Sequence, residues 1–285
     1  MSARLAILAA AFLFSTGGAA IKAASLTAWQ IASYRSLIAC VVFLAILPAA
    51  RRGWTWRMVP VAVAHALTLT LFVLATKSTT SANAIFLQAT APLFLLFLAP
   101  WLLGERLGWR DLIGPSAIAV GMALFFVAEQ PPAVTAPNPG FGNLCAAASG
   151  LTWALTVTGL RWLNRSGIPG GYASAAMGNL FAGAIAFAPA LPMPQFSTTD
   201  LSVLLYLGIF QIGLSYFLLN RGLAHVPAFE ASTLILLEPA LNPVWTYLWH
   251  GERPAGLALL GGAIIGAATL FQSWLASRQR SRPSA

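Results

Sequence analysis

Long apolar runs recur along the whole chain and constrain its fold more than any other feature. A helix that crosses about 30 Å of hydrocarbon needs on the order of 20 predominantly apolar residues. Runs of about that size cover residues 5–22, 30–47, 58–76, 82–103, 112–128, 143–163, 171–189, 201–219, 227–249 and 256–276. Because connectors with Gly, Pro and charged residues separate these runs, we predict an all-α polytopic membrane protein with ten transmembrane helices.

The composition excludes an ordinary soluble domain. Of the 285 residues, 58% are hydrophobic and 8% are charged, and the mean hydropathy is +0.77, whereas soluble domains carry about 25% charged residues. A net charge of +9 would suggest nucleic acid in a soluble protein, but here the basic residues are dispersed between the apolar runs. We therefore interpret them as topology signals, with membrane lipids around the chain and no nucleic-acid partner.

The placement of the basic residues predicts how the chain enters the membrane. With the N-terminus inside, twelve of the sixteen basic residues fall at cytoplasmic ends of the predicted spans, and the other four are Lys22, Arg35, Lys77 and Arg253. Since basic residues concentrate on the cytoplasmic side, both termini are predicted to be cytoplasmic. Fourteen of the sixteen are arginine and alanine is abundant, which indicates a GC-rich bacterial genome and hence a multi-pass protein of the bacterial inner membrane.

The chain also repeats itself at an offset of 147 residues. The stretch 91–114 aligns with 238–261, so that Pro92 meets Pro239 and the first Gly-Glu-Arg triplet, at 104–106, meets the second triplet. Two matched triplets with a proline at the same distance before each of them indicate a tandem duplication.

The two halves are predicted to be inverted with respect to each other. Each half contains five predicted spans, an odd number, so the second half enters the membrane from the opposite side. At a slightly different offset, 14–22 matches 153–161, and both segments end in a base. Inverted repeats recur in secondary transporters, whose binding site lies near the membrane midplane. The predicted units are a first repeat at 1–128, a Pro-rich periplasmic linker at 129–142, a second repeat at 143–276 and a basic cytoplasmic tail at 277–285.

The motif around the first triplet resembles a known family. In a duplicated ten-helix chain, the pattern P...GERL...G...A..G resembles the EamA type of the drug/metabolite transporter superfamily; it consists of Pro92, Gly104, Glu105, Arg106, Leu107, Gly114 and Gly121. The resemblance implies a basket of ten helices made of inverted five-helix repeats, and export of small metabolites, often amino acids. Arg35 resembles an arginine common in these proteins. The second copy departs from the pattern at Pro254 and Ala268.

An acidic residue interrupts the ninth apolar run. Helical spacing places Glu238, Asn242, Trp245 and Trp249 on one stripe, whereas the equivalent positions of the first repeat are all apolar. A carboxylate inside a span costs about 2.5 to 3.5 kcal/mol and usually serves a function. We predict that Glu238 binds a substrate amine or carries a proton; the alternative is a neutral Glu238 that holds a helix break by hydrogen bonds. The predicted helix-break residues are Pro92, Pro239 and Pro243.

Further polar and aromatic residues inside the runs complete the predicted substrate site. The set comprises Glu238, Arg35, Gln88, Trp153, Gln211, Tyr216, Asn242 and Trp245. Glu238 and Arg35 offer charges, the two tryptophans offer apolar walls, and the others offer hydrogen bonds. For proton coupling, Glu238 is the first candidate and His65 the second, although a lone histidine is also explained as a packing residue.

Motifs of enzymatic or nucleotide-driven chemistry are missing from the sequence. It contains no Walker loop, no HExxH, no G-x-S-x-G and no Cys/His cluster with metal spacing. Cys40 and Cys145 both lie in apolar runs, as packing cysteines do. We therefore predict no enzymatic activity, no cofactor and no metal site.

Together these features predict a secondary transporter that exports small metabolites by alternating access. The expected small-molecule substrates are amino acids, aromatic or otherwise apolar. Drugs, nucleobases and other metabolites remain alternative cargoes. A channel is disfavoured because the polar residues are sparse and form no rings of charge, and a non-transporting scaffold is the third alternative. The sequence does not predict the oligomeric state, the coupling ion or the resting conformation.

Overall fold

The chain folds into a bundle of helices in the computed structural model, which describes residues 1–104, 112–128, 131–168, 171–223, 225–226 and 228–280. Within these residues no β-strand forms, and β-pairing is limited to an isolated bridge between Ala133 and Ala136. The predicted all-α class is thus confirmed. Six helical stretches are long and apolar enough to cross a membrane, and two shorter apolar helices accompany them. The full count of ten spans stays a prediction.

The first half of the chain contains seven described α-helices. They are α1 (Ala3–Ser15), α2 (Gly17–Ala23), α3 (Ala28–Ile46), α4 (Val59–Ser78), α5 (Ser81–Gln88), α6 (Ala91–Leu103) and α7 (Ile113–Val127). Hydroxyl side chains fix several starts: Thr27 forms a capping box with Gln30, and the Thr80 side chain accepts a hydrogen bond from the backbone N–H of Asn83.

The second half follows the same plan. Its helices are α8 (Pro139–Arg165), α9 (Gly171–Phe187), α10 (Thr198–Leu205), a π-helical segment (Tyr206–Leu214), α11 (Ser215–Leu223), α12 (Ala228–Ile235), α13 (Leu237–His250) and α14 (Gly256–Arg280). Ser197 and Asp200 form the capping box that starts α10.

Three of the predicted runs are interrupted by a turn. The breaks fall at Thr16 between α1 and α2, at 89–90 between α5 and α6, and at Leu236 between α12 and α13. The Thr16 and Thr90 hydroxyls donate to carbonyls three residues earlier, those of Leu13 and Leu87, at 2.7 and 2.6 Å. Such local bonds compete with the helical ladder. Each of the three runs contains two helices joined by a turn, and the breaks in 82–103 and 227–249 fall just before Pro92 and Pro239, two of the predicted helix-break residues.

The backbone repeats at the same 147-residue offset as the sequence. The break at Ala89 corresponds to the break at Leu236. Gly104 and Gly251 both follow a helix and both adopt the left-handed conformation, with φ of 63° and 65°. Left-handed glycine is a common way to end a helix. The duplicated sequence therefore produces duplicated turns; Glu105 and Arg106 of the first triplet lie outside the described residues.

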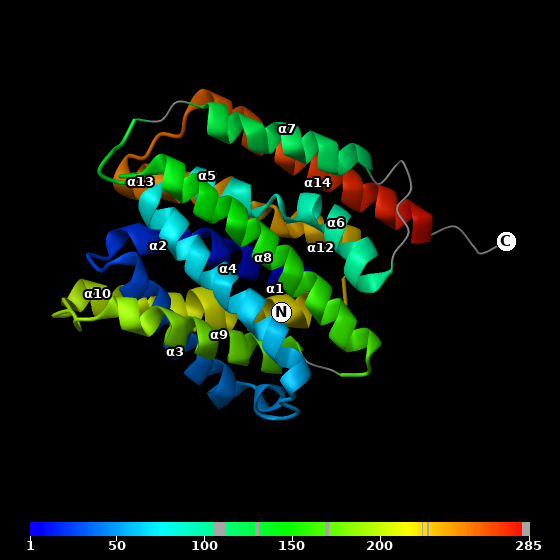
Figure 1. The fold of residues 1–285 in the computed structure, drawn as a ribbon, viewed down its shortest axis with the longest axis horizontal. Coiled ribbons are helices and arrows are strands. Elements are labelled where there is room, and N and C mark those ends of the chain that lie inside the picture. The colour runs from blue at the N-terminus through cyan, green and yellow to red at the C-terminus, as the bar shows by residue number, and fades with distance from the viewer. Residues whose placement is uncertain (105–111, 129–130, 169–170, 224, 227, 281–285) are drawn as a thin grey trace.

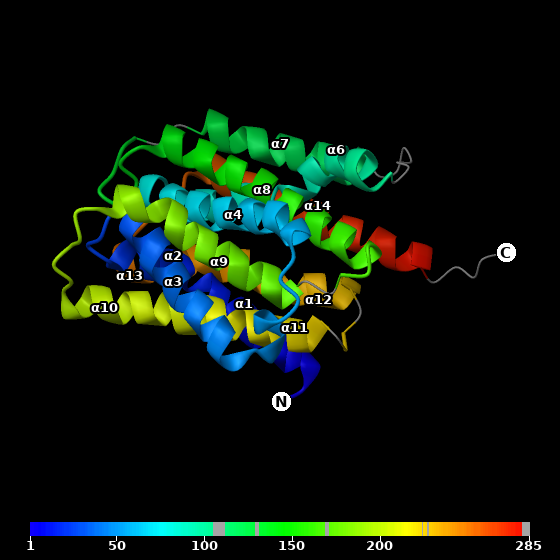
Figure 2. The ribbon, with the colours of Figure 1, turned by 60° about the horizontal axis from the view of Figure 1, so that its bottom comes forward.

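Equivalent helices make equivalent contacts in the two halves. Helix α4 of the first half packs against α8, and its equivalent α11 packs against α1. In the same way α5 and α6 pack against α8, and their equivalents α12 and α13 pack against α1. The pairs α3 with α9 and α7 with α14 join corresponding helices. Figure 1 shows α7 and α14 on one side of the bundle and α3, α9 and α10 on the other, with α1, α4, α5 and α8 between them. In the turned view of Figure 2, α7 stays at the top and α10 lies towards the bottom.

Helices α7 and α14 cross at a pair of glycines. A Cβ atom added to Gly121 would lie 2.8 Å from the carbonyl oxygen of Gly261, and a Cβ atom added to Gly261 would lie 2.6 Å from that of Gly121. Small residues let two membrane helices approach backbone to backbone. This crossing joins the last helix of one half to the last helix of the other.

Candidate functional site

Glu238 lies in the first turn of α13, directly after the break at Leu236. A carboxylate there is favoured by the partial positive charge of a helix N-terminus. Pro239 is also in this first turn, where a missing backbone N–H costs no helical bond, and Pro92 holds the equivalent place in α6. The helix continues through Pro243.

Asn242 lies one turn beyond Glu238 and is fully buried. Its Oδ1 atom accepts a hydrogen bond of 2.6 Å from the Ser81 hydroxyl at the start of α5. Its buried Nδ2 group has no hydrogen-bond partner. Since buried polar groups are normally paired, the free amide donor marks a place where a ligand could bind.

The predicted stripe on α13 is divided between the interior and the surface. The indole N–H of Trp245 donates to the Ser15 hydroxyl at 2.9 Å, and its ring meets the edge of Phe12 at 5.6 Å. Trp249 is 68% exposed. The inner part of α13 therefore faces α1 at the point where α1 ends, and Trp249 faces the surroundings.

Arg35 is a buried cation that forms no ion pair with the residues the structure describes. The residue, on α3, is 1% exposed. The Nη2 atom donates to the Leu69 carbonyl of α4 at 3.0 Å, and the Nε group has no hydrogen-bond partner. The ion pairs within the described residues are Arg4–Glu230 and Lys22–Glu252. Neither Arg35 nor Glu238 belongs to either of these ion pairs.

Tyr216 is the centre of an aromatic cluster. Its ring meets His65 edge to face at 5.9 Å, and Phe14 and Phe43 contact it in the same way at 5.3 and 6.0 Å. The Trp153 ring is tilted against that of His65, with the ring centroids 6.3 Å apart. The cluster thus brings together α1, α3, α4, α8 and α11, and the Nε2 atom of the buried His65 has no partner.

The two glutamines lie at different places. Gln88 donates to the Ser149 hydroxyl at 2.7 Å, and Ser149 donates to the Thr68 carbonyl at 3.1 Å, so this chain of bonds joins α5, α8 and α4. Gln211 packs against Gly17 beside the first helix break, and its buried Oε1 atom is unpaired. The predicted residues therefore lie in separate groups: those of α13, those around Tyr216, the Gln88 chain, Gln211 beside the first break, and Arg35 between α3 and α4.

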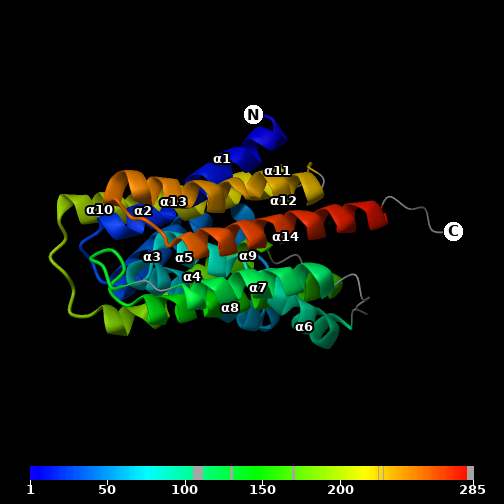
Figure 3. The same ribbon diagram turned by 90° about the horizontal axis from the view of Figure 1, so that it is seen from above.

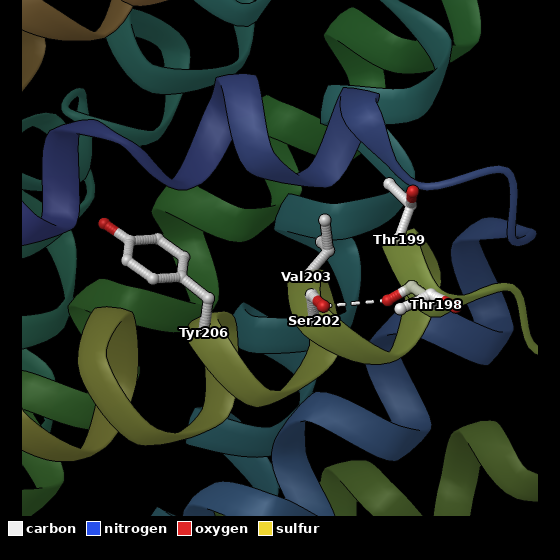
Figure 4. Close-up of a pocket in the computed structure, with 5 residues that line it drawn as sticks. All are labelled: Thr198, Thr199, Ser202, Val203 and Tyr206. Carbon is white, nitrogen blue, oxygen red and sulfur yellow. Dashed lines mark hydrogen bonds between the residues drawn. The ribbon is translucent and has the colours of Figure 1, made fainter.

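Two cavities are lined by other residues. One, of about 340 Å³, is lined by Thr198, Thr199, Ser202, Val203 and Tyr206 (Figure 4). The Tyr206 hydroxyl is 2.8 Å from that of Thr16. The other, of about 390 Å³, lies between α4, α6 and α8 and includes Pro60, Trp101 and Trp162. None of the predicted site residues lines either cavity.

Sequence reasoning missed a polar cluster at one end of the bundle. Lys22 and Glu252 form a buried ion pair there, and Asn83 and Asn143 share a hydrogen bond of 2.9 Å. The available signal was that Lys22 and Glu252 both belong to repeated segments: each is the base or acid of a matched motif.

The helices, the duplicated turns and the buried charges define a multi-pass membrane protein built from two repeats. The sequence profile of the EamA-like transporter family matches residues 1–127 and again 140–274. The chain belongs to this transporter family, which confirms the resemblance stated above.

Two curated relatives and one solved structure are similar to this chain. A "Probable terminal-alkyne amino-acid exporter" of Streptantibioticus cattleyicolor is 28% identical over 189 residues, which cover 64% of this chain and 60% of the relative. An "Uncharacterized transporter YdfC" of Bacillus subtilis is 35% identical over 68 residues, covering 24% of this chain and 22% of the relative. The matches thus span less than two thirds of either relative. A crystal structure with 19% identity covers 98% of this chain and 99% of its own, with a TM-score of 0.64, and shares the fold.

Proposed function

We propose that the protein exports small zwitterionic metabolites, amino acids above all, across the bacterial inner membrane by alternating access. The observation that carries the proposal is that two opposite charges on the helices of the bundle, Arg35 and Glu238, both lack a charged partner among the described residues. A zwitterion carries both missing partners: its carboxylate complements Arg35 and its ammonium group complements Glu238.

The surroundings of these charges favour an apolar cargo side chain. Trp153, Tyr216 and Trp245 lie in or beside the aromatic contacts of the bundle interior. Aromatic rings offer large apolar surfaces with a polar edge. Aromatic and branched amino acids therefore fit better than small polar ones. The name of the Streptantibioticus relative, an amino-acid exporter, agrees with this substrate class.

The proposal keeps the membrane topology expected from the sequence. Ten spans would form two inverted repeats, 1–128 and 143–276, with both termini and the tail 277–285 in the cytoplasm and the linker 129–142 in the periplasm. The equivalent contacts of the two halves support such an arrangement. Two similar halves of opposite orientation can exchange two conformations around a site between them.

Counterflow in proteoliposomes tests the proposed function. Vesicles are loaded with one unlabelled amino acid at a time, and uptake of the same labelled amino acid is compared with uptake by protein-free vesicles. The proposal predicts accelerated exchange of aromatic and branched amino acids. Exchange of nucleobases or drugs alone would favour the alternative cargoes, flux without counterflow would indicate a channel, and no flux of any solute would indicate a scaffold.

Proton coupling is a separate prediction that concerns Glu238. An inward-directed pH gradient should stimulate transport by the unaltered protein. In Glu238→Gln the ratio of the transport rate with the gradient to the rate without it should fall to about 1, because the amide cannot release a proton. His65→Gln is the matched control and should keep the ratio. A Glu238→Gln protein that still responds to the gradient would remove the coupling role from Glu238.

A further inference from the structure

Lys22 and Glu252 form an ion pair that is shielded from the surroundings. Lys22 lies in the last turn of α2, and Glu252 follows Gly251 at the end of α13. The Lys22 Nζ atom is 3.0 Å from Glu252 Oε1, and both side chains are 3% exposed. The pair joins the first repeat to the second.

Backbone groups from two further segments complete this contact. Lys22 Nζ also donates to the carbonyl of Thr79, at 2.9 Å, and to that of Thr135. Glu252 Oε2 accepts a hydrogen bond of 2.9 Å from the backbone N–H of Ser81. The pair therefore holds together α2, the turn before α5, the segment before α8 and the turn after α13, at the end of the bundle where Figure 3 shows α2 and α13 side by side.

One residue connects this ion pair to the proposed substrate site. Ser81 uses its backbone N–H for Glu252 and its hydroxyl for Asn242. Gly18 of α2 packs onto both Ser81 and Asn242, and a Cβ atom there would lie 2.7 Å from Asn242 Oδ1. The ion pair, together with Ser81 and Gly18, thus covers Asn242 from this end of the molecule.

The equivalent base at the other end of the molecule is in a different environment. At the offset that aligns 14–22 with 153–161, Lys22 corresponds to Arg161. Lys22 is buried in an ion pair, whereas Arg161 is exposed. Two positions related by the repeat therefore differ in burial, as expected of a carrier that is closed at one end.

We infer that the Lys22–Glu252 pair is the gate that closes the outer end of the transport path, and that this structure shows it shut. The inference rests on the proposed transport function. Two buried charges are tolerated because they neutralise each other and are hydrogen-bonded, and a single one left behind is strongly disfavoured. Opening hydrates both groups, so loss of one partner penalises the closed state and shifts the population towards the open one.

Accessibility of a buried cysteine tests the gate without any substrate. Ile85, which is 4% exposed, lies one turn beyond Ser81 on α5, and Ile85→Cys serves as the reporter. Spheroplasts are treated with a membrane-impermeant maleimide, and the unaltered protein, whose Cys40 and Cys145 are buried, gives the background. The reporter is combined with Glu252→Gln, with Lys22→Met, and with both changes together.

Each single change should accelerate labelling of the reporter about tenfold or more. The double change leaves no uncompensated charge, so labelling should return towards the slow rate of the reporter alone. Lys77→Met is the matched control: Lys77 donates to the Ala24 carbonyl and is not the ion-pair partner of Glu252, so its loss should not accelerate labelling.

Equal labelling rates in all variants would overturn the gate, and so would a double variant that labels as fast as the single ones, because opening would then come from lost packing. If one single variant fails to insert, the other single variant and the double variant still decide between these outcomes. A gate that responds as expected in a protein without amino-acid counterflow would leave the gate standing and remove the proposed cargo.

Discussion

Replacement of Arg35 by methionine should reduce amino-acid counterflow at least about 30-fold. Truncation of one partner of a buried, hydrogen-bonded charge pair costs about 2 kcal/mol or more, and 1.4 kcal/mol corresponds to a factor of ten. Methionine fills a similar volume but offers no donor to a substrate carboxylate. The measurement is the initial rate of exchange in proteoliposomes with equal amounts of protein.

Two further variants separate substrate binding from folding. Arg35→Lys keeps the charge but loses the planar fork of donors, so it should recover only part of the rate. Arg57→Met removes an exposed cation and should leave exchange unchanged. If Arg35→Met exchanges within about threefold of the unaltered protein, the arginine does not bind the substrate.

Substitution at Gly261 should destabilise the protein, whereas the same substitution five residues later should not. In Gly261→Ala the new methyl group would lie 2.6 Å from the Gly121 carbonyl oxygen and 2.9 Å from the Phe125 ring, and overpacking of this kind costs about 1 to 3 kcal/mol. A thermal unfolding scan in detergent should show a lower midpoint, and α7 and α14 should separate first.

Gly266 provides the matched control on the same helix. Nothing lies within 4 Å of a Cβ atom at Gly266, and alanine exceeds glycine in helix propensity by about 0.8 to 1 kcal/mol. Gly266→Ala should therefore be neutral or stabilising. Equal midpoints for the two variants would contradict the close α7–α14 crossing.

Much of the fold follows from local features of the sequence. Apolar runs of membrane length predicted the helices, and the paired prolines and Gly-Glu-Arg triplets predicted the duplication. The structure adds that the duplicated positions also share backbone conformation, as Gly104 and Gly251 do. Glycine and hydroxyl residues act within one turn of the chain, so their effects can be read from neighbouring residues.

The break at Thr16 was not predicted, whereas the breaks at 89–90 and at Leu236 fall just before Pro92 and Pro239, which were predicted as helix-break residues. At the ends of α1 and α5, the Thr16 and Thr90 hydroxyls donate hydrogen bonds to carbonyls three residues earlier. In a long apolar run such a threonine is equally compatible with an unbroken helix. Hydropathy alone therefore could not distinguish the two outcomes.

Partners across the bundle could not be predicted for a different reason. Gln88 bonds to Ser149, 61 residues away, and Lys22 pairs with Glu252, 230 residues away. Such contacts depend on which helices pack together and on their rotation, which a single sequence does not specify. The charges of Arg35 and Glu238 were identified from the sequence because an ionisable residue in an apolar run stands out at any position.

The most direct test of the account is competition against counterflow of labelled phenylalanine by three compounds: phenylalanine itself, the corresponding amine without the carboxylate, and the corresponding acid without the ammonium group. Hydrogen bonds to charged groups contribute about 1.5 to 3 kcal/mol each. We therefore expect each truncated analogue to compete at least about tenfold more weakly than phenylalanine. In Glu238→Gln, the acid should not compete more strongly than phenylalanine does. Equal competition by all three compounds, or no amino-acid exchange by folded protein, would contradict the account.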